Sequence, residues 1–215
     1  MKNRRFIFAF TIIVFCGFAC DAKAKEFCVA TAVEIENALS DAETNGESDI
    51  VKIQQGLYNS NFSFSSNEDT SITVLGGYGS ACSSRVVDPS NTVIDAGGTG
   101  TPLSFTKNSD GDVAVEGLTL QNGGYRGFYV RLYNDAGGNV GSVTLTRNII
   151  AQNKPRGGIY ISSSDNPTHI PGAIRLTGNI IAGNRSDYGA GGLAMQANWY
   201  DSANDLILTN NQIVG

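Results

Sequence analysis

The stretch Val143-Thr-Leu-Thr-Arg-Asn-Ile-Ile-Ala-Gln-Asn153 recurs as Ile174-Arg-Leu-Thr-Gly-Asn-Ile-Ile-Ala-Gly-Asn184 and as Leu206-Ile-Leu-Thr-Asn-Asn-Gln-Ile-Val-Gly215. The copies are spaced 31 and 32 residues apart, and a looser copy, Val113–Asn122, precedes them by one period with one residue deleted. Aliphatic and polar residues alternate at the start of each copy, which is the period of a β-strand. The pattern predicts stacked repeats that bury their apolar sides against one another.

Each unit continues with a second β-run that follows a glycine, as in Gly127–Leu132, Gly158–Ser163 and Gly192–Ala197. Side chains alternate across a strand, so the aliphatic positions of both runs are expected to line one interior as columns. Gln212 replaces the isoleucine of the other copies, which indicates that its position faces outward. The predicted fold class is all-β, a parallel β-helix with coils about 4.8 Å apart. The predicted interior columns contain Val143, Leu145, Ile174, Leu176, Leu206, Leu208, Phe128, Val130, Leu132, Ile159, Ile161, Leu193 and Met195.

An asparagine recurs at one repeat position between two β-runs, as Asn148, Asn179 and Asn211. Asparagine tolerates the left-handed backbone that a sharp turn requires. Stacked asparagine side chains can also donate hydrogen bonds to one another along a column. These three residues are therefore predicted to form a structural column and not a binding site.

The first 24 residues have the composition of a signal peptide. A basic segment at residues 2–5 precedes an apolar stretch at 6–19, shorter than the roughly 20 residues that span a bilayer. Ala22-Lys-Ala24 is a small-x-small cleavage site, so cleavage is expected before Lys25. An uncleaved anchor and a lipoprotein attached at Cys20 remain alternatives. Export to the extracellular or outer-membrane surface is predicted, with the periplasm as the other compartment.

The mature chain divides into an N-terminal cap, residues 25–49, and a β-helix, residues 50–215. Thr31-Ala-Val-Glu34 has the spacing of a capping box and opens an amphipathic stretch through about Ala42. A helix there is expected to cover the open end of the core. The sequence stops within a repeat, so truncation is expected, with fraying or end-to-end association of the last coil.

Cysteine content and charge limit the partners further. Cys16 and Cys20 lie in or beside the signal, which leaves Cys28 and Cys82. In an oxidising compartment this pair predicts a disulfide, with two free thiols as the alternative. The net charge is −5 and the mature part has no basic cluster, so nucleic acid is not an expected partner. No transmembrane segment is expected in the mature chain.

Three short motifs in the N-terminal half are typical of one superfamily. They are Gly56-Leu-Tyr58 after an aliphatic run, Gly76-Gly-Tyr78 shortly before Cys82, and the Ile-Asp-x-Gly-Gly turn Ile94–Gly98. With these motifs the chain resembles the right-handed parallel β-helix proteins of the pectin-lyase-like superfamily, over residues 28–215. The repeats also resemble those of bacterial polymorphic outer-membrane and autotransporter passengers. The resemblance implies a right-handed β-helix and leaves activity open, because this scaffold hosts lyases, hydrolases, epimerases and adhesins.

The outward positions do not assemble a recognisable catalytic set. Pectate-lyase-like enzymes carry acidic Ca²⁺ ligands and a basic catalytic residue on the outer face of the first sheet. The matching positions here include Ala114, Glu116, Thr144 and Arg175, and no two carboxylates stack there. His169, the one histidine, is expected in a surface loop. No catalytic residue, metal ligand or cofactor is predicted.

A second outward face has the composition of a sugar-binding surface. Aromatic faces pack against the C–H faces of sugars, while polar groups meet the hydroxyls. An alternative is that exposed strands simply favour tyrosine. The favoured function is a noncatalytic exported surface or matrix protein for adhesion or for binding a polysaccharide or cell-surface glycan; the alternative is a polysaccharide lyase, hydrolase or epimerase with its active site in coils outside this sequence. The proposed face comprises Tyr129, Arg131, Tyr133, Tyr160, Gln196 and Trp199.

Overall fold

The computed structural model describes residues 24–135, 139–163, 172–197 and 205–215, and it is mostly β-structure with all strands paired in parallel. Sheet A contains β1 (Lys25–Val29), β2 (Asp49–Gln54), β5 (Ile72–Tyr78), β8 (Val113–Glu116), β11 (Val143–Thr146), β14 (Ile174–Thr177) and β17 (Leu206–Thr209). Sheet B contains β3 (Gly56–Asn59), β6 (Thr92–Asp95), β9 (Thr119–Gln121), β12 (Ile149–Ala151), β15 (Ile180–Ala182) and β18 (Gln212–Val214). Sheet C contains β4 (Phe62–Ser66), β7 (Leu103–Asn108), β10 (Phe128–Tyr133), β13 (Ile159–Ser163) and β16 (Leu193–Ala197).

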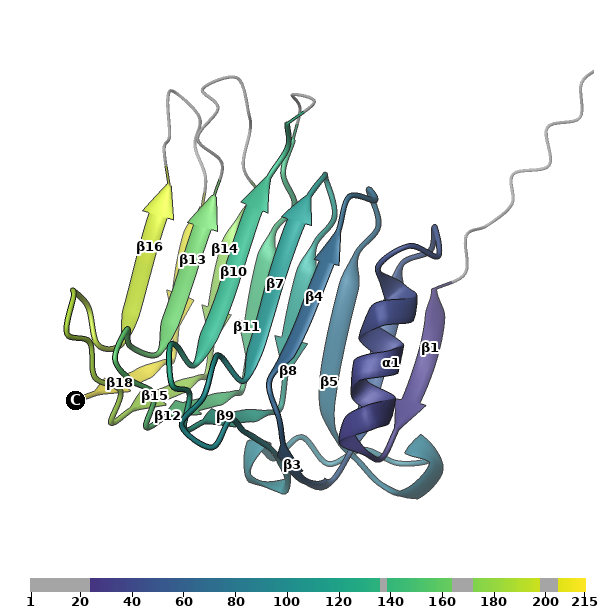
Figure 1. Ribbon diagram of the computed structural model, residues 1–215, viewed down its shortest axis with the longest axis horizontal. Helices are drawn as coiled ribbons and strands as arrows, with labels where there is room; N and C mark the ends of the chain where they lie inside the picture. Colours follow the sequence, from purple (N-terminus) through teal and green to yellow (C-terminus); the bar gives the residue numbers. More distant parts are fainter. Residues whose placement is uncertain (1–23, 136–138, 164–171, 198–204) are drawn as a thin grey trace, which may run out of the picture.

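From β2 onward the chain passes through sheets A, B and C in the same order, and each pass adds one strand to each sheet. The result is an elongated stack with the helix α1 at one end and the C-terminus at the other (Figure 1). This arrangement is consistent with a β-helix-like solenoid, in which each coil contacts mainly its neighbours.

The register confirms the aliphatic columns. Val143 pairs with Ile174, which pairs with Leu206, and Ile159 pairs with Phe128 and Leu193. The column residues of the middle coils are buried, whereas Leu206 and Leu208 on the last strand of sheet A are about half exposed. The outward orientation predicted at the Gln212 position is also confirmed, because Ile180, its partner in the preceding coil, is 36% exposed.

The looser copy of the repeat contains no deletion. Val113 pairs with Val143 and Leu120 pairs with Ile150, so the two coils keep the same spacing between these positions. Asn122 therefore corresponds to Gln152, and both have a left-handed backbone, with φ of 54° and 59°. The sequence alignment that matched Asn122 with Asn153 was wrong because it weighted residue identity over the length of the turn.

The asparagine column is buried and its hydrogen bonds run along the stack. Asn148 Nδ2 donates to Asn179 Oδ1 (3.1 Å) and to the Val115 carbonyl (3.0 Å). Asn179 repeats this arrangement with Asn211 Oδ1 (3.0 Å) and the Leu145 carbonyl (2.9 Å). The Oδ1 atoms of Asn148 and Asn179 also accept from the backbone amides of Leu118 and Asn148, both at 3.0 Å, so the column satisfies backbone donors at the turn.

The left-handed residue of this turn is not the asparagine, as the sequence had suggested, but the residue before it. Arg147, Gly178 and Asn210 have φ of 51°, 65° and 53°. The asparagine is thereby free to point into the stack. A second buried pair, Asn153 with Asn184, repeats the device at the next turn, where Asn153 Nδ2 lies 2.8 Å from Asn184 Oδ1.

The helix α1 (Ala32–Ala42) begins at the expected capping box. The Thr31 side chain accepts from the Glu34 amide (3.2 Å), and the Glu34 carboxylate accepts from the Thr31 amide (3.1 Å). Its buried face includes Ile35 and Leu39, and it packs against β1, β2 and β4. Within the described ranges no helix combines the length and apolarity needed to cross a bilayer.

The predicted disulfide is present. Cys28 on β1 is bonded to Cys82, with a Cα–Cα distance of 5.8 Å. Cys82 ends the 3₁₀-helix η1 (Ser80–Cys82), which follows β5, and a second short 3₁₀-helix, η2 (Pro89–Asn91), leads into β6. The bond therefore links β1 to the segment after β5, two strands further along sheet A. On the chain-entropy model, closing a loop of this length raises the free energy of unfolding by about 4 kcal/mol.

Candidate functional site

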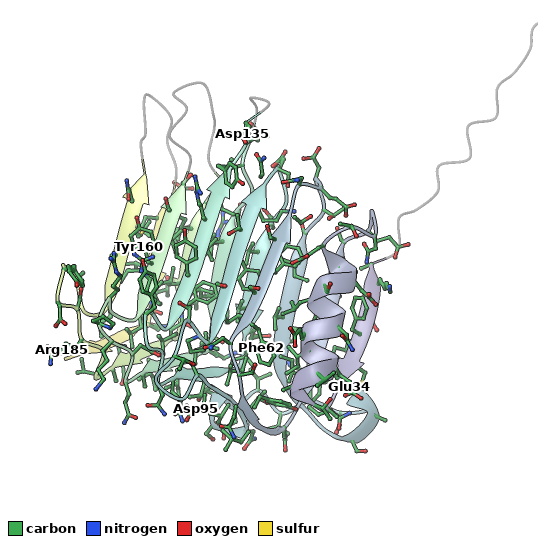
Figure 2. The ribbon with its side chains drawn as sticks, in the orientation of Figure 1. Glu34, Phe62, Asp95, Asp135, Tyr160 and Arg185 are labelled. Carbon is green, nitrogen blue, oxygen red and sulfur yellow. A yellow bond between two sulfur atoms is a disulfide. The ribbon has the colours of Figure 1, made fainter. Side chains whose placement is uncertain are left out.

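The outer face of sheet C brings two of the proposed tyrosines together. Tyr129 on β10 pairs in register with Tyr160 on β13, and their rings are stacked with centroids 5.9 Å apart and an angle of 15° between planes. Both side chains point outward because Phe128 and Ile159 before them point into the core. Parallel pairing thus brings the tyrosines of two successive coils together, whereas Ser104 and Ala194 occupy the same position on the neighbouring strands; Tyr160 is labelled in Figure 2.

An arginine from the loop between β9 and β10 is packed into this surface. The Arg126 guanidinium carbon lies 3.8 Å from the Tyr160 ring centroid, 5.2 Å from that of Tyr129 and 4.9 Å from that of Tyr125. The residue is 9% exposed, and its Nε is buried with no hydrogen-bond partner among the described residues. Three ring faces therefore stabilise a cation that has lost most of its water.

A second arginine from the equivalent loop of the next coil lies beside the first. The Arg156 guanidinium is 4.8 Å from the ring centroids of both Tyr125 and Tyr188. The two arginines line one cavity of about 230 Å³, together with Tyr160, Tyr188 and Ser186. Small residues, Gly189, Ala190 and Ala194, complete its wall.

The arginines of this surface have no acidic partner. Among the described residues, Arg126, Arg131 and Arg156 form no ion pair, whereas Arg185 nearby is paired with Asp187 at 2.7 Å. Burial raises the pKa of the Tyr129 hydroxyl, although the charges of Arg131 and Arg126 oppose this. Tyr129 is therefore a neutral hydrogen-bonding group beside an uncompensated positive charge.

The other proposed residues lie on the same face but only partly in this cluster. The Tyr160 hydroxyl donates to Gln196 Oε1 on β16. Arg131 and Tyr133 form a separate pair further along β10, with the guanidinium 4.6 Å from the ring centroid. Trp199 lies outside the described residues.

Sequence reasoning missed four members of the cluster. Tyr125, Arg126, Arg156 and Tyr188 come from the loops between sheets B and C, where the repeats differ in sequence. An available signal was the arginine that precedes a glycine before the second β-run, as Arg126-Gly127 and Arg156-Gly157.

A larger cavity of about 510 Å³ lies at the same turns but offers less chemistry. Four glycines contribute to its wall, and its charged residue is Lys154. The neighbouring Asp95 carboxylate is engaged by Gln121 (2.8 Å) and Asn122 (2.7 Å), and also by the Gly97 amide. With its charged neighbour engaged within the chain, this cavity is a weaker candidate than the arginine-lined one.

The outer face of sheet A contains a structural ion-pair network. Glu116 is paired with Arg85 (2.7 Å) and with Arg147. Burial by itself raises the pKa of Glu116, but the hydrogen bonds and charges of Arg147 and Arg85 outweigh it and lower the pKa below the ordinary value. In the described part of the chain, no three His, Cys, Asp or Glu side chains are grouped so as to hold a metal ion.

Lys107 is a buried titratable group of the core. It occupies an inward position on β7, is fully buried, and its Nζ donates to the carbonyls of Glu68 (2.6 Å) and Thr70 (2.5 Å). Burial lowers its pKa to about 8, although Asp69 and other nearby carboxylates oppose the shift. Because its partners are backbone carbonyls of the loop between β4 and β5, its role is to hold that loop.

No protein-family model matches the chain, and searches of curated proteins and of solved structures also find no match.

Proposed function

We propose that this chain is an exported, noncatalytic β-helix protein that binds glycans through the outer face of sheet C. The observation that carries the proposal is the stacked Tyr129–Tyr160 pair beside a cavity lined by Arg126 and Arg156. Tyrosine rings can pack against the C–H faces of sugars, and both of these side chains are partly exposed on this face. The neighbouring amide, hydroxyl and guanidinium groups supply the directional hydrogen bonds that fix orientation.

The repeating geometry also favours an extended ligand. Successive coils present Tyr129, Tyr160 and Gln196 on adjacent strands of one face. A polymer lying across the strands would meet Tyr129 and Tyr160 on two successive coils and Gln196 on the next, so its affinity would combine contacts from three coils. This is the expected arrangement for adhesion or for retention in a polysaccharide matrix.

The proposal includes a right-handed coil of the pectin-lyase-like type, and export directed by residues 1–24. Three parallel sheets visited in a fixed order support the first, because crossovers between parallel strands are almost always right-handed. The Cys28–Cys82 bond supports the second, since disulfides persist in oxidising compartments.

Glu116, a carboxylate on the outer face of sheet A, is not suited to act as the general acid of a polysaccharide-cleaving enzyme. A general acid requires a raised pKa, whereas Arg85 and Arg147 lower the pKa of this carboxyl. The charge of Glu116 is used to hold the two arginines and not to donate a proton.

The test is binding and turnover measured on the same samples. Purified protein is titrated with neutral and acidic oligosaccharides, and the mixtures are assayed for new reducing ends and for unsaturated ends. We expect saturable binding without turnover, at least about 10-fold weaker in Tyr160→Ala. The matched control is Tyr78→Ala, because Tyr78 also contacts cations, Lys52 and Arg85, but is the last residue of β5 in sheet A. New sugar ends, or equal loss in both variants, would contradict the proposal.

A further inference from the structure

We propose that the cavity between Arg126 and Arg156 is a site for an anionic group, a carboxylate or sulfate ester carried by the bound glycan. This inference rests on the proposed function and adds the chemical class of the ligand. The cavity shares Tyr160 with the stacked pair, but most of its wall comes from the loops between sheets B and C.

The first argument is the state of Arg126. Its side chain is more than nine-tenths buried and lines the cavity, yet it has neither an ion pair nor a hydrogen bond with a described residue. Tyrosine faces attract a cation but carry no net charge. A desolvated guanidinium therefore creates a positive potential that an anion entering the cavity would neutralise.

The second argument is the approach of two like charges to one ring. Arg126 lies 4.9 Å and Arg156 4.8 Å from the centroid of Tyr125. Guanidinium groups bind carboxylate and sulfate oxygens with strong charge-assisted hydrogen bonds. An anion held by both arginines would convert mutual repulsion into attraction.

The third argument is that the remaining groups suit an anion. Ser186 Oγ accepts from the Tyr188 amide at 3.2 Å, so its hydroxyl hydrogen is available to a ligand. The nearby Asp187 carboxylate is occupied by Arg185 through two hydrogen bonds, 2.9 and 2.7 Å. The cavity of about 230 Å³ is below the range of about 300–1,000 Å³ typical of drug-sized ligands, so it suits one charged sugar substituent and not a whole oligomer.

Overall charge does not explain such binding. The chain has a net charge of −5, which repels an acidic polymer as a whole. Affinity for the acidic form must therefore come from a local arrangement of arginines, and it should weaken as salt concentration rises.

The experiment compares a linear oligoglucuronate with the same oligosaccharide after its carboxyl groups are reduced to primary alcohols. Titration calorimetry with purified wild-type protein is expected to show at least about 10-fold tighter binding of the acidic form. Arg156→Gln should remove most of this preference, because it weakens binding of the acidic form far more than binding of the reduced form. Arg156 is exposed, so the substitution does not disturb the core.

Arg175→Gln is the control, since it makes the same charge change at an exposed position on the outer face of sheet A. Equal affinity for the two oligosaccharides, or an equal effect of both substitutions, would overturn the anion site while leaving glycan binding intact. Binding of inorganic sulfate that depends on Arg156, without binding of either oligosaccharide, would support the anion site and reject the glycan as its source.

Discussion

The interior asparagine turn and the outer face of sheet C are built by the same stacking of coils, but they treat polar groups in opposite ways. In the turn, Asn148 and Asn179 pass hydrogen bonds from one coil to the next and leave few groups free. On the outer face, Arg126 and Arg156 lie against tyrosine rings, with no acidic partner in the part of the chain that the structure describes. Polar groups that the chain satisfies serve stability, and polar groups that it leaves unsatisfied are available to a ligand.

The largest effect is expected from Asn179→Ala. The substitution removes the acceptor of the buried Asn148 backbone amide and of Asn148 Nδ2, each at a cost of about 1–3 kcal/mol. We expect the free energy of unfolding to fall by about 3 kcal/mol in urea denaturation, with glycan affinity unchanged.

Asn211→Ala is the matched control, because Asn211 is half-buried in the last coil. It also removes the acceptor of the Asn179 backbone and side-chain amides, but water can replace that acceptor at the exposed last coil, so it should cost less than Asn179→Ala. A loss in Asn179→Ala no greater than in Asn211→Ala would show that the column is not the structural element described above.

A smaller effect should separate a paired arginine from an unpaired one. Arg85→Met removes the ion pair with Glu116 and the hydrogen bond from Nε to the Gly76 carbonyl, so a loss of about 2 kcal/mol is expected. Arg126→Met keeps the packing of the stem and removes a buried charge without an acidic partner, so stability should change by less than about 1 kcal/mol. Thermal unfolding of both variants decides this, and a larger loss in Arg126→Met would mean that this arginine is structural.

Lys107 should make the free energy of unfolding depend gradually on pH. The pKa of Lys107 is about 8 in the folded chain against 10.5 when unfolded, so between these values the unfolded state binds more protons. Stability should therefore rise with pH from about 8 to 10, by up to about 1 kcal/mol per unit, and the penalty is fully present below pH 8. Urea denaturation at pH 7.5, 8.5 and 9.5 measures the slope, and Lys107→Met should flatten it. An equal slope in both proteins would exclude Lys107 as the cause.

The sequence predicts the strands and the N-terminal cap of this molecule better than it predicts the loops. The aliphatic columns, the capping box of α1 and the Cys28–Cys82 bond follow from patterns that depend on neighbouring residues or on repetition. Arg126 and Arg156 do not, because they precede the second β-run by different offsets in successive coils: Phe128 pairs with Ile159, which places Arg126 opposite Gly157. Their contact with the tyrosines depends on how two unequal loops fold over the same sheet.

The left-handed turn position shows the same limit on a smaller scale. Asparagine favours that backbone, but Arg147 adopts it here and Asn148 points into the stack instead. Local preference was overruled because the buried amide makes hydrogen bonds that an exposed turn residue cannot make.

The most direct test of the account is an NMR titration of the ¹⁵N-labelled protein with the linear oligoglucuronate. The account predicts shifts at Tyr129, Tyr160 and Arg156 on and beside sheet C, and at the Arg126 side chain between them. Shifts confined to Thr144, Arg175 and their neighbours on the outer face of sheet A, with none on sheet C, would contradict it.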